Sequence, residues 1–206
     1  EVLQLAAIAT ALGLPETEPG PLEIALNPAD VVWAQKQLGQ QPLTLVGIHG
    51  AGKWLSQGWT AADFLALGRS VLSGCTAANL PPAKVLLTFG PGDGELAAAV
   101  TQALALQPDP EIILPGPLTI PRWAAFASLC DVIITPDTGS LHLAVAVNRP
   151  VVAMYEASTF LHCSTQWAPW LVPHALVRRD IPAVTIPVIV AETLRLLSAE
   201  TSGDRS

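Results

Sequence analysis

Four short runs of consecutive apolar residues, separated by longer segments of mixed polarity, dominate the pattern of the chain. Runs of this kind are typical of strands that are buried on both faces of a parallel sheet. The intervening segments have the length and composition of helices, so βαβ units and an α/β fold with a Rossmann-like parallel sheet flanked by helices are predicted. The expected strands are LTLVGIH (43–49), KVLLTF (84–89), DVIIT (131–135) and PVVAMY (150–155), with a shorter one at 111–114, and the expected helices are 60–72, 94–106, 121–129 and 140–148.

The two ends of the chain extend this pattern. Residues 2–12 contain no helix breaker and stop at Gly13, which predicts a short helix, and the Pro- and Glu-rich segment 14–26 is expected to be a linker. Asn27 and Pro28 are a helix start, with the helix continuing to about Leu38. A sixth strand at 175–177 and a helix at 187–198 are expected to complete the sheet. We therefore divide the chain into a connector with its first helix (1–41), a Rossmann-like domain (42–199) and a mobile polar tail (200–206).

Composition excludes several classes of protein. The 206 residues are 50% hydrophobic and 13% charged, which suits one globular domain. The mean hydropathy is +0.45, yet no apolar run approaches the ~20 residues needed to span a membrane, so a soluble protein is expected. A net charge of −7 with ten scattered Lys and Arg residues argues against a nucleic-acid partner. The three cysteines have no disulfide or metal-ligand spacing, so we expect no metal and a reducing cytosol.

Three loops that follow predicted strands are candidates for ligand binding, because ligands of open parallel sheets bind outside the carboxyl ends of the strands. The first is HGAGK at 49–53, which precedes a helix that opens with capping-box spacing at Thr60 and Asp63. Its glycines allow backbone N–H groups to approach an anion, with a charge from the lysine; the alternative is a flexible turn. The residues concerned are Gly50, Ala51, Gly52 and Lys53.

The second loop, GPGDGE at 90–95, is a partial dinucleotide fingerprint. Its third glycine falls one position early and no acidic residue closes the next strand, which argues against a nicotinamide or flavin site.

The third loop, TPDTGSLH at 135–142, opens a helix directly after a strand. Asp137 is placed to cap this helix, and the N–H groups of Thr138, Gly139 and Ser140 lie at its positive end. Such a terminus suits a diphosphate. His142 is one helical turn beyond Thr138 on the same face, so it can donate to the same anion. The alternative is an ordinary Asp cap followed by a buried histidine.

These segments, in this order, resemble glycosyltransferase family 9, the family of bacterial lipopolysaccharide heptosyltransferases. The resemblance runs from about residue 42 to 158. It rests on the glycine loop with Trp59 beyond it, on Phe89-Gly90-Pro91 followed by Glu95, and on PDTGSLHLAVAVNRPVVAMY. It implies the C-terminal half of a GT-B enzyme, which binds a sugar nucleotide between two Rossmann-like domains. It also implies an inverting transfer that needs no metal or other cofactor, with the general base on an N-terminal domain outside this chain, so that this half is inactive alone.

The resemblance assigns roles to individual residues. Thr138 and Gly139 would meet the donor diphosphate, with Asp137 and His142 organising the pocket. Two positions depart from the family pattern. Gln57 stands where a lysine before the tryptophan is usual, so either Lys53 replaces that charge or the charge is lost. Glu156 stands where a glycine is usual, and can repel a phosphate or accept from a ribose hydroxyl.

We therefore expect the donor-binding domain of a glycosyltransferase that moves a heptose-like or other sugar from a nucleotide-diphosphate donor to a lipopolysaccharide or other envelope glycan. The expected location is the cytoplasm, with at most peripheral association with the inner membrane. Two other readings stay open. One is a non-catalytic module that binds a nucleotide or nucleotide sugar in a degenerate GT-B site, and the other is a GT-B epimerase or phosphorylase.

Overall fold

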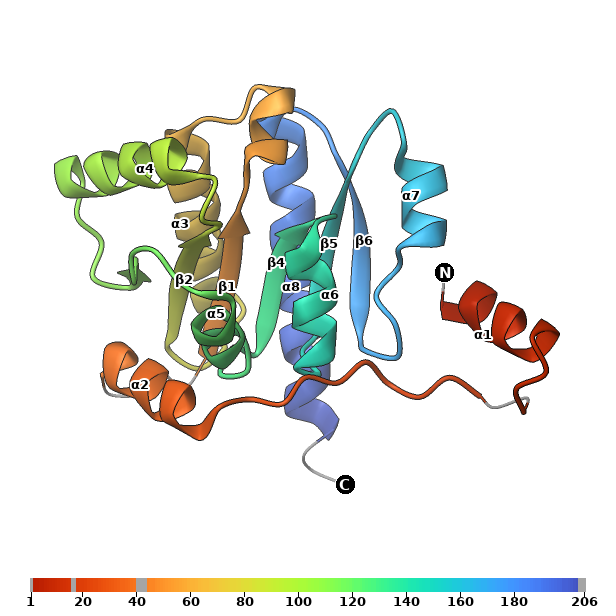
Figure 1. Cartoon of the computed structure of the whole chain (residues 1–206). Coiled ribbons are helices and arrows are strands. Elements are labelled where there is room, and N and C mark those ends of the chain that lie inside the picture. Colours follow the sequence, from red (N-terminus) through yellow and green to blue (C-terminus); the bar gives the residue numbers. More distant parts are fainter. Residues whose placement is uncertain (1, 16–17, 40–43, 204–206) are drawn as a thin grey trace.

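Six parallel strands form one sheet in the computed structural model, which describes residues 2–15, 18–39 and 44–203 (Figure 1). The strand order is β3-β2-β1-β4-β5-β6, so the chain builds outward from β1 in one direction and then crosses to its other side. Every predicted strand is present, and the predicted fold class is confirmed. The strands are β1 (Thr44–Gly50), β2 (Ala83–Phe89), β3 (Ile112–Ile113), β4 (Val132–Pro136), β5 (Val151–Glu156) and β6 (His174–Arg179).

Helices cover both faces of the sheet and create two hydrophobic cores. One core lies beneath α3 (Ala61–Ala77), α4 (Gly94–Leu106) and α8 (Pro182–Gly203). The other lies beneath α2 (Pro28–Leu38), α5 (Ile120–Ala127), α6 (Gly139–Ala146) and α7 (Phe160–Gln166). All seven residues of β1 are buried, because β1 contributes side chains to both cores. Its unbroken apolar run follows from this double burial.

The predicted helix starts at Asn27 and Thr60 are confirmed. The Asn27 side chain accepts a hydrogen bond from the N–H of Ala29, and Pro28 occupies the first turn of α2. The Asp63 carboxylate accepts from the N–H of Thr60 at 2.8 Å, which closes the capping box of α3. Each side chain satisfies a backbone donor that the helix itself leaves without a partner.

Four elements differ from the prediction, and one of them is α3, which continues to Ala77, five residues past its predicted end. A 3-10 helix, η1 (Gly52–Gln57), and the helix α7 lie in segments without a helical pattern. The last helix, α8, begins at Pro182, five residues before its predicted start, and includes Pro187. It continues to Gly203, so the first four residues of the expected mobile tail are helical, whereas 204–206 lie outside the described residues.

Part of α8 is also long and apolar enough to cross a membrane by length and composition. This window is Pro182–Ala199, with a mean hydropathy of 1.4. The prediction that no stretch approaches this length was wrong, because Pro187 interrupts the apolar pattern in the sequence but not the helix. In the structure α8 packs against α3 and β6, and its Ile189 and Leu196 are buried.

The first helix, α1 (Val2–Ala11), lies apart from both cores beside α7 (Figure 1). None of its residues is buried. Residues 14–15 and 18–27 form neither helix nor strand, in agreement with the predicted linker. The indole N–H of Trp170 donates to the carbonyl oxygen of Gly20, which holds this linker against the domain.

A close contact between β1 and β2 explains the glycine at the end of β1. A Cβ added to Gly50 would lie 2.5 Å from Cε1 of Phe89, well inside van der Waals contact. Phe89 packs in turn against Phe64 of α3. Gly50 is therefore required by the packing of two aromatic rings.

We expect the substitution Gly50→Ala to lower the free energy of unfolding by about 1–3 kcal/mol, because the added methyl group overpacks the contact with Phe89. Urea unfolding measures the change. The matched control is Gly92→Ala, since a Cβ there meets no atom within 4 Å. Equal stabilities of the two variants would show that the Phe89 ring moves aside freely.

A small polar cluster is buried where α5 packs on the ends of β1 and β2. His49 Nδ1 lies 3.1 Å from Thr88 Oγ1, and the indole N–H of Trp123 donates to both of these atoms, at 3.1 and 3.0 Å. Burial lowers the pKa of His49 to about 4, although the charge of Asp93 opposes the shift. His49 is therefore neutral at neutral pH.

This shift makes the stability of the fold depend on pH. An unfolded histidine has a pKa of about 6.5, so between pH 6.5 and 4 the unfolded chain binds a proton that native His49 does not. Stability therefore falls as the pH falls through this window, and His49→Phe removes the effect. Relative to this variant, we expect wild type to lose about 3 kcal/mol of unfolding free energy from pH 7 to pH 4. If the unfolding free energies of wild type and His49→Phe changed equally with pH, the lowered pKa of His49 would be contradicted.

Candidate functional site

The loops after β1 and β4 meet at the carboxyl edge of the sheet. β1 pairs with β2 on one side and with β4 on the other, so the order of the strands reverses at β1. Connections leave the two neighbours β1 and β4 in opposite directions, toward α3 on one face and α6 on the other. A crevice at such a reversal is where open parallel sheets bind ligands.

The turn that joins β4 to α6 is built around Thr138. Thr138 has the extended backbone of an N-cap residue, with φ −145° and ψ −177°, and α6 begins at Gly139. The expectation that Asp137 caps the helix was wrong, because Asp137 lies one position too early. Its N–H donates instead to the carbonyl oxygen of Met154, which ties the turn to β5.

The first two N–H groups of α6 have no hydrogen-bond acceptor among the described residues. Those of Gly139 and Ser140 donate to no residue that the structure describes, whereas Leu141 N–H bonds to Thr138 O. Gly139 is exposed, and a Cβ added there would meet no atom within 4 Å. The Ser140 hydroxyl lies 2.6 Å from the hydroxyls of both Thr135 and Thr138, which orders the turn from within. Two oriented donors are thus available to an anion at the positive end of the helix.

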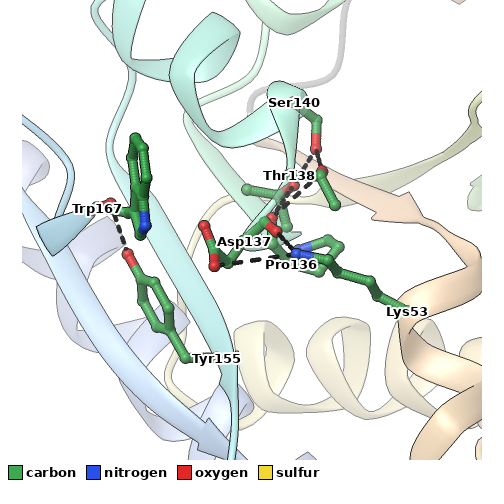
Figure 2. Close-up of polar contacts among 8 residues, drawn as sticks. Lys53, Pro136, Asp137, Thr138, Ser140, Tyr155 and Trp167 are labelled. Atoms are coloured by element: carbon green, nitrogen blue, oxygen red, sulfur yellow. Dashed lines mark hydrogen bonds and ion pairs between the residues drawn. The ribbon is translucent and has the colours of Figure 1, made fainter. Parts of the chain in front are cut away.

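Lys53 brings a positive charge to this turn from the loop after β1. Its ammonium group donates to the carbonyl oxygen of Asp137 and lies 3.9 Å from Asp137 Oδ2. Figure 2 shows the lysine reaching from η1 to the turn. Its side chain is 56% exposed, so this pair is weak and the charge stays accessible to a ligand. The Gln57 side chain lies outside the described part of the structure.

The glycine loop after β1 serves mainly to shape this edge. The N–H of Gly52 donates to Asp93 Oδ1 at 2.7 Å, so in this structure it is turned to the β2–α4 loop and not to a ligand. Gly50 accommodates Phe89, and Ala51 is buried. The loop therefore positions Lys53, and the oriented N–H donors come from α6.

His142 lies in a separate hollow. It packs edge-on against Trp167, with ring centroids 6.0 Å apart, and lines a cavity of about 360 Å³ with residues of α1 and the segment after α7. The Tyr155 hydroxyl donates to the carbonyl oxygen of Trp167 at 2.8 Å and anchors this wall (Figure 2). Gly139 and Ser140 line a different cavity, so the structure does not bring His142 together with them.

The two predicted carboxylates are exposed. Glu95 lies in the first turn of α4. Glu156 ends β5, where its carboxylate accepts from Ser158 Oγ at 3.0 Å. Its strand partner is Arg179, whose pKa is lowered by burial, with the charge of Glu156 opposing the shift. Glu156 thus lies close to a cation, which reduces the repulsion that it would exert on a phosphate.

One side chain that the sequence did not single out also faces the α6 turn. His49 lines a cavity of about 190 Å³, here called the His49 cavity, together with Gly139 and Ser140 of α6 and apolar residues that include Phe89, Leu118 and Trp123. Its position in the first candidate loop was the only signal in the sequence. Its partners Thr88 and Trp123 are 39 and 74 residues away.

The described residues hold no group of three or more His, Cys, Asp or Glu side chains that could bind a metal ion. The chemistry that they offer is electrostatic: one exposed ammonium group, two oriented backbone donors and nearby hydroxyls. Such a set suits a diphosphate.

Comparison with known proteins identifies the family of the chain. The family model for glycosyltransferase family 9 (heptosyltransferase) matches residues 2–181. Lipopolysaccharide heptosyltransferase 3 of Escherichia coli is 31% identical over 87 residues, which are 42% of this chain and 24% of that protein.

Two solved structures share the fold. The glycosyl transferase family 9 protein of Veillonella parvula has a TM-score of 0.72 and 16% identity, over 94% of this chain and 58% of that one. The ADP-heptose lps heptosyltransferase II of E. coli has a TM-score of 0.69 and 19% identity, over 93% and 57%. The chain thus spans less than three fifths of each solved relative. Because the family model covers most of its length, this chain belongs to glycosyltransferase family 9, the heptosyltransferase family.

Proposed function

We propose that this chain is the donor-binding half of a glycosyltransferase that transfers a heptose-like or other sugar from a nucleotide-diphosphate donor to a lipopolysaccharide or other envelope glycan. The observation that carries the proposal is the convergence of Lys53 with the open N–H groups of Gly139 and Ser140 at the reversal of strand order. The leaving group in such a transfer is a nucleoside diphosphate, whose developing charge these groups would stabilise.

Lys53 supplies the charge that Gln57 does not. It reaches the α6 turn from a different position in the loop, where its ammonium group donates to the carbonyl oxygen of Asp137, the residue before the N-cap of α6. The Asp137 carboxylate alone would repel a diphosphate, and the lysine 3.9 Å away offsets that charge. This favours replacement of the family lysine over its loss, and hence a working donor site over a degenerate one.

The remaining parts of the reaction are proposed to lie outside this chain. The relatives of known structure are longer than this chain. We place the acceptor site and the general base on an N-terminal half of the whole protein. Transfer would invert the anomeric centre without a metal ion. The protein would work in the cytoplasm, at most peripherally attached to the inner membrane, and this half alone would bind donor without transferring sugar.

Removal of one N–H donor tests the diphosphate site. Gly139→Pro removes the N–H at the first position of α6, where proline is well tolerated, and the extended backbone of Thr138 is compatible with a following proline. We expect isothermal titration with ADP, UDP and GDP to show saturable binding of at least one by wild type, weakened about tenfold in the variant.

The matched control for this substitution is Ala61→Pro, at the first position of α3, which should bind like wild type. Failure of the folded wild-type chain to bind any of the three nucleotides would overturn the proposal. Equal affinities of wild type and Gly139→Pro would remove the α6 terminus from the site.

Removal of the charge tests Lys53. Lys53→Met should weaken binding of the same nucleotide about tenfold and flatten its dependence on salt concentration, because one ammonium–phosphate contact is lost. Titrations between 50 and 300 mM NaCl measure both effects. Lys36→Met, on the exposed face of α2, is the control and should change neither. An unchanged salt dependence in Lys53→Met would assign the charge to another group.

A further inference from the structure

The His49 cavity is small and has no charged side chain in its lining. Its volume of about 190 Å³ is below the 300–1,000 Å³ of pockets that hold drug-sized ligands, so it takes a single ring and not a whole nucleotide sugar. Apolar side chains such as Phe89, Leu118 and Leu143 form most of its wall. A phosphate would lose its hydration there without a cation in return, which argues for an uncharged occupant.

Trp123 determines which nitrogen of His49 carries the proton. The indole N–H can only donate, and it is shared between Thr88 Oγ1 at 3.0 Å and Nδ1 of His49 at 3.1 Å, so its hydrogen bond to His49 requires that Nδ1 accepts. With a proton on Nδ1, the N–H groups of His49 and Trp123 would face each other with no acceptor between them. The proton of the neutral ring therefore lies on Nε2, and the lowered pKa of His49 keeps the ring neutral at physiological pH.

The Nε2–H group is available to a ligand. Nε2 makes no hydrogen bond to any residue that the structure describes. It is also not among the fully buried side-chain nitrogens without a partner, so solvent reaches it. His49 is 9% exposed and lines two cavities, of which one, at about 10 Å³, is too small for a ligand, so a ligand would reach Nε2 through the His49 cavity.

We propose that His49 is a ligand-binding residue that donates its Nε2–H to a hydroxyl oxygen of the sugar ring next to the donor diphosphate. The proposal rests on the proposed function, because Gly139 and Ser140, which would hold the diphosphate, also line this cavity. Both rings bonded to the diphosphate of a nucleotide sugar are sugars with hydroxyl groups. The source of the ring is thus either the ribose of the nucleoside or the transferred sugar.

Two substitutions of His49 separate its hydrogen bond from its packing. His49→Phe removes the donor but fills the same space, and Trp123 keeps Thr88 as an acceptor. His49→Gln keeps an N–H donor near the position of Nε2. We expect His49→Phe to raise the Kd of the ligand about 2- to 12-fold, which corresponds to the loss of one neutral hydrogen bond. His49→Gln should keep most of the wild-type affinity. His162→Phe, on the exposed surface of α7, is the matched control.

Isothermal titration with pyrophosphate, ADP and ADP-heptose distinguishes the sources of the ring. Weaker binding of both ADP and ADP-heptose, with pyrophosphate unchanged, would assign the ribose. Weaker binding of ADP-heptose alone would assign the transferred sugar. Unchanged binding of both, or an equal loss for pyrophosphate, would overturn this inference and leave the proposed function standing. Failure of wild type to bind any nucleotide would overturn both.

The tautomer gives a second readout that packing alone would not move. Nitrogen-correlated NMR of the histidine ring should show Nδ1 unprotonated and Nε2 protonated from pH 5 to 8, with the Nε2–H signal shifting when ADP-heptose binds. A proton on Nδ1, or an Nε2–H signal that ignores saturating ligand, would contradict the assignment.

Discussion

The pairing of β1 with both β2 and β4 is the constraint on which the rest of the structure depends. It places a fully buried strand between two hydrophobic cores, so both faces of β1 must be apolar and both must be covered by helices. It also places the loop after β1 against the loop after β4. Lys53 can therefore contact Asp137, although the two residues are 84 positions apart in the sequence.

The loops at this edge are held by contacts with one another more than by their own sequences. Asp93 precedes α4 but makes no cap with its side chain, and its carboxylate accepts instead from Gly52 in the neighbouring loop. His49 is held by Trp123 of α5 in the same way. At this edge the exposed ammonium group of Lys53 and the first N–H groups of α6 are held in place before a ligand arrives, which is the arrangement that preorganised binding of an anion requires.

Most of the fold could be predicted from the sequence, whereas the roles within the candidate site could be predicted only in part. Apolar runs and helix signals are local, so the strands and the caps at Asn27 and Thr60 were predicted correctly. The predicted start of α8 was wrong because Pro187 was taken as the first helical residue, whereas the helix begins at Pro182 and continues through Pro187. The prediction that Asp137 caps α6 was wrong by one residue, because Thr138 is the N-cap. The N–H of Asp137 donates to Met154 of β5, which keeps Asp137 with the end of β4.

The sequence by itself determined the parallel α/β architecture and the turn that places backbone donors after β4, since periodicity and turn chemistry act between near neighbours in the chain. Only the tertiary structure decided which groups share a cavity: Gly139 and Ser140 with His49, and His142 with Trp167. Such choices depend on strand order and on helix packing between residues far apart in the chain. The proton position on His49 is the clearest case, because it is determined by an indole 74 residues away.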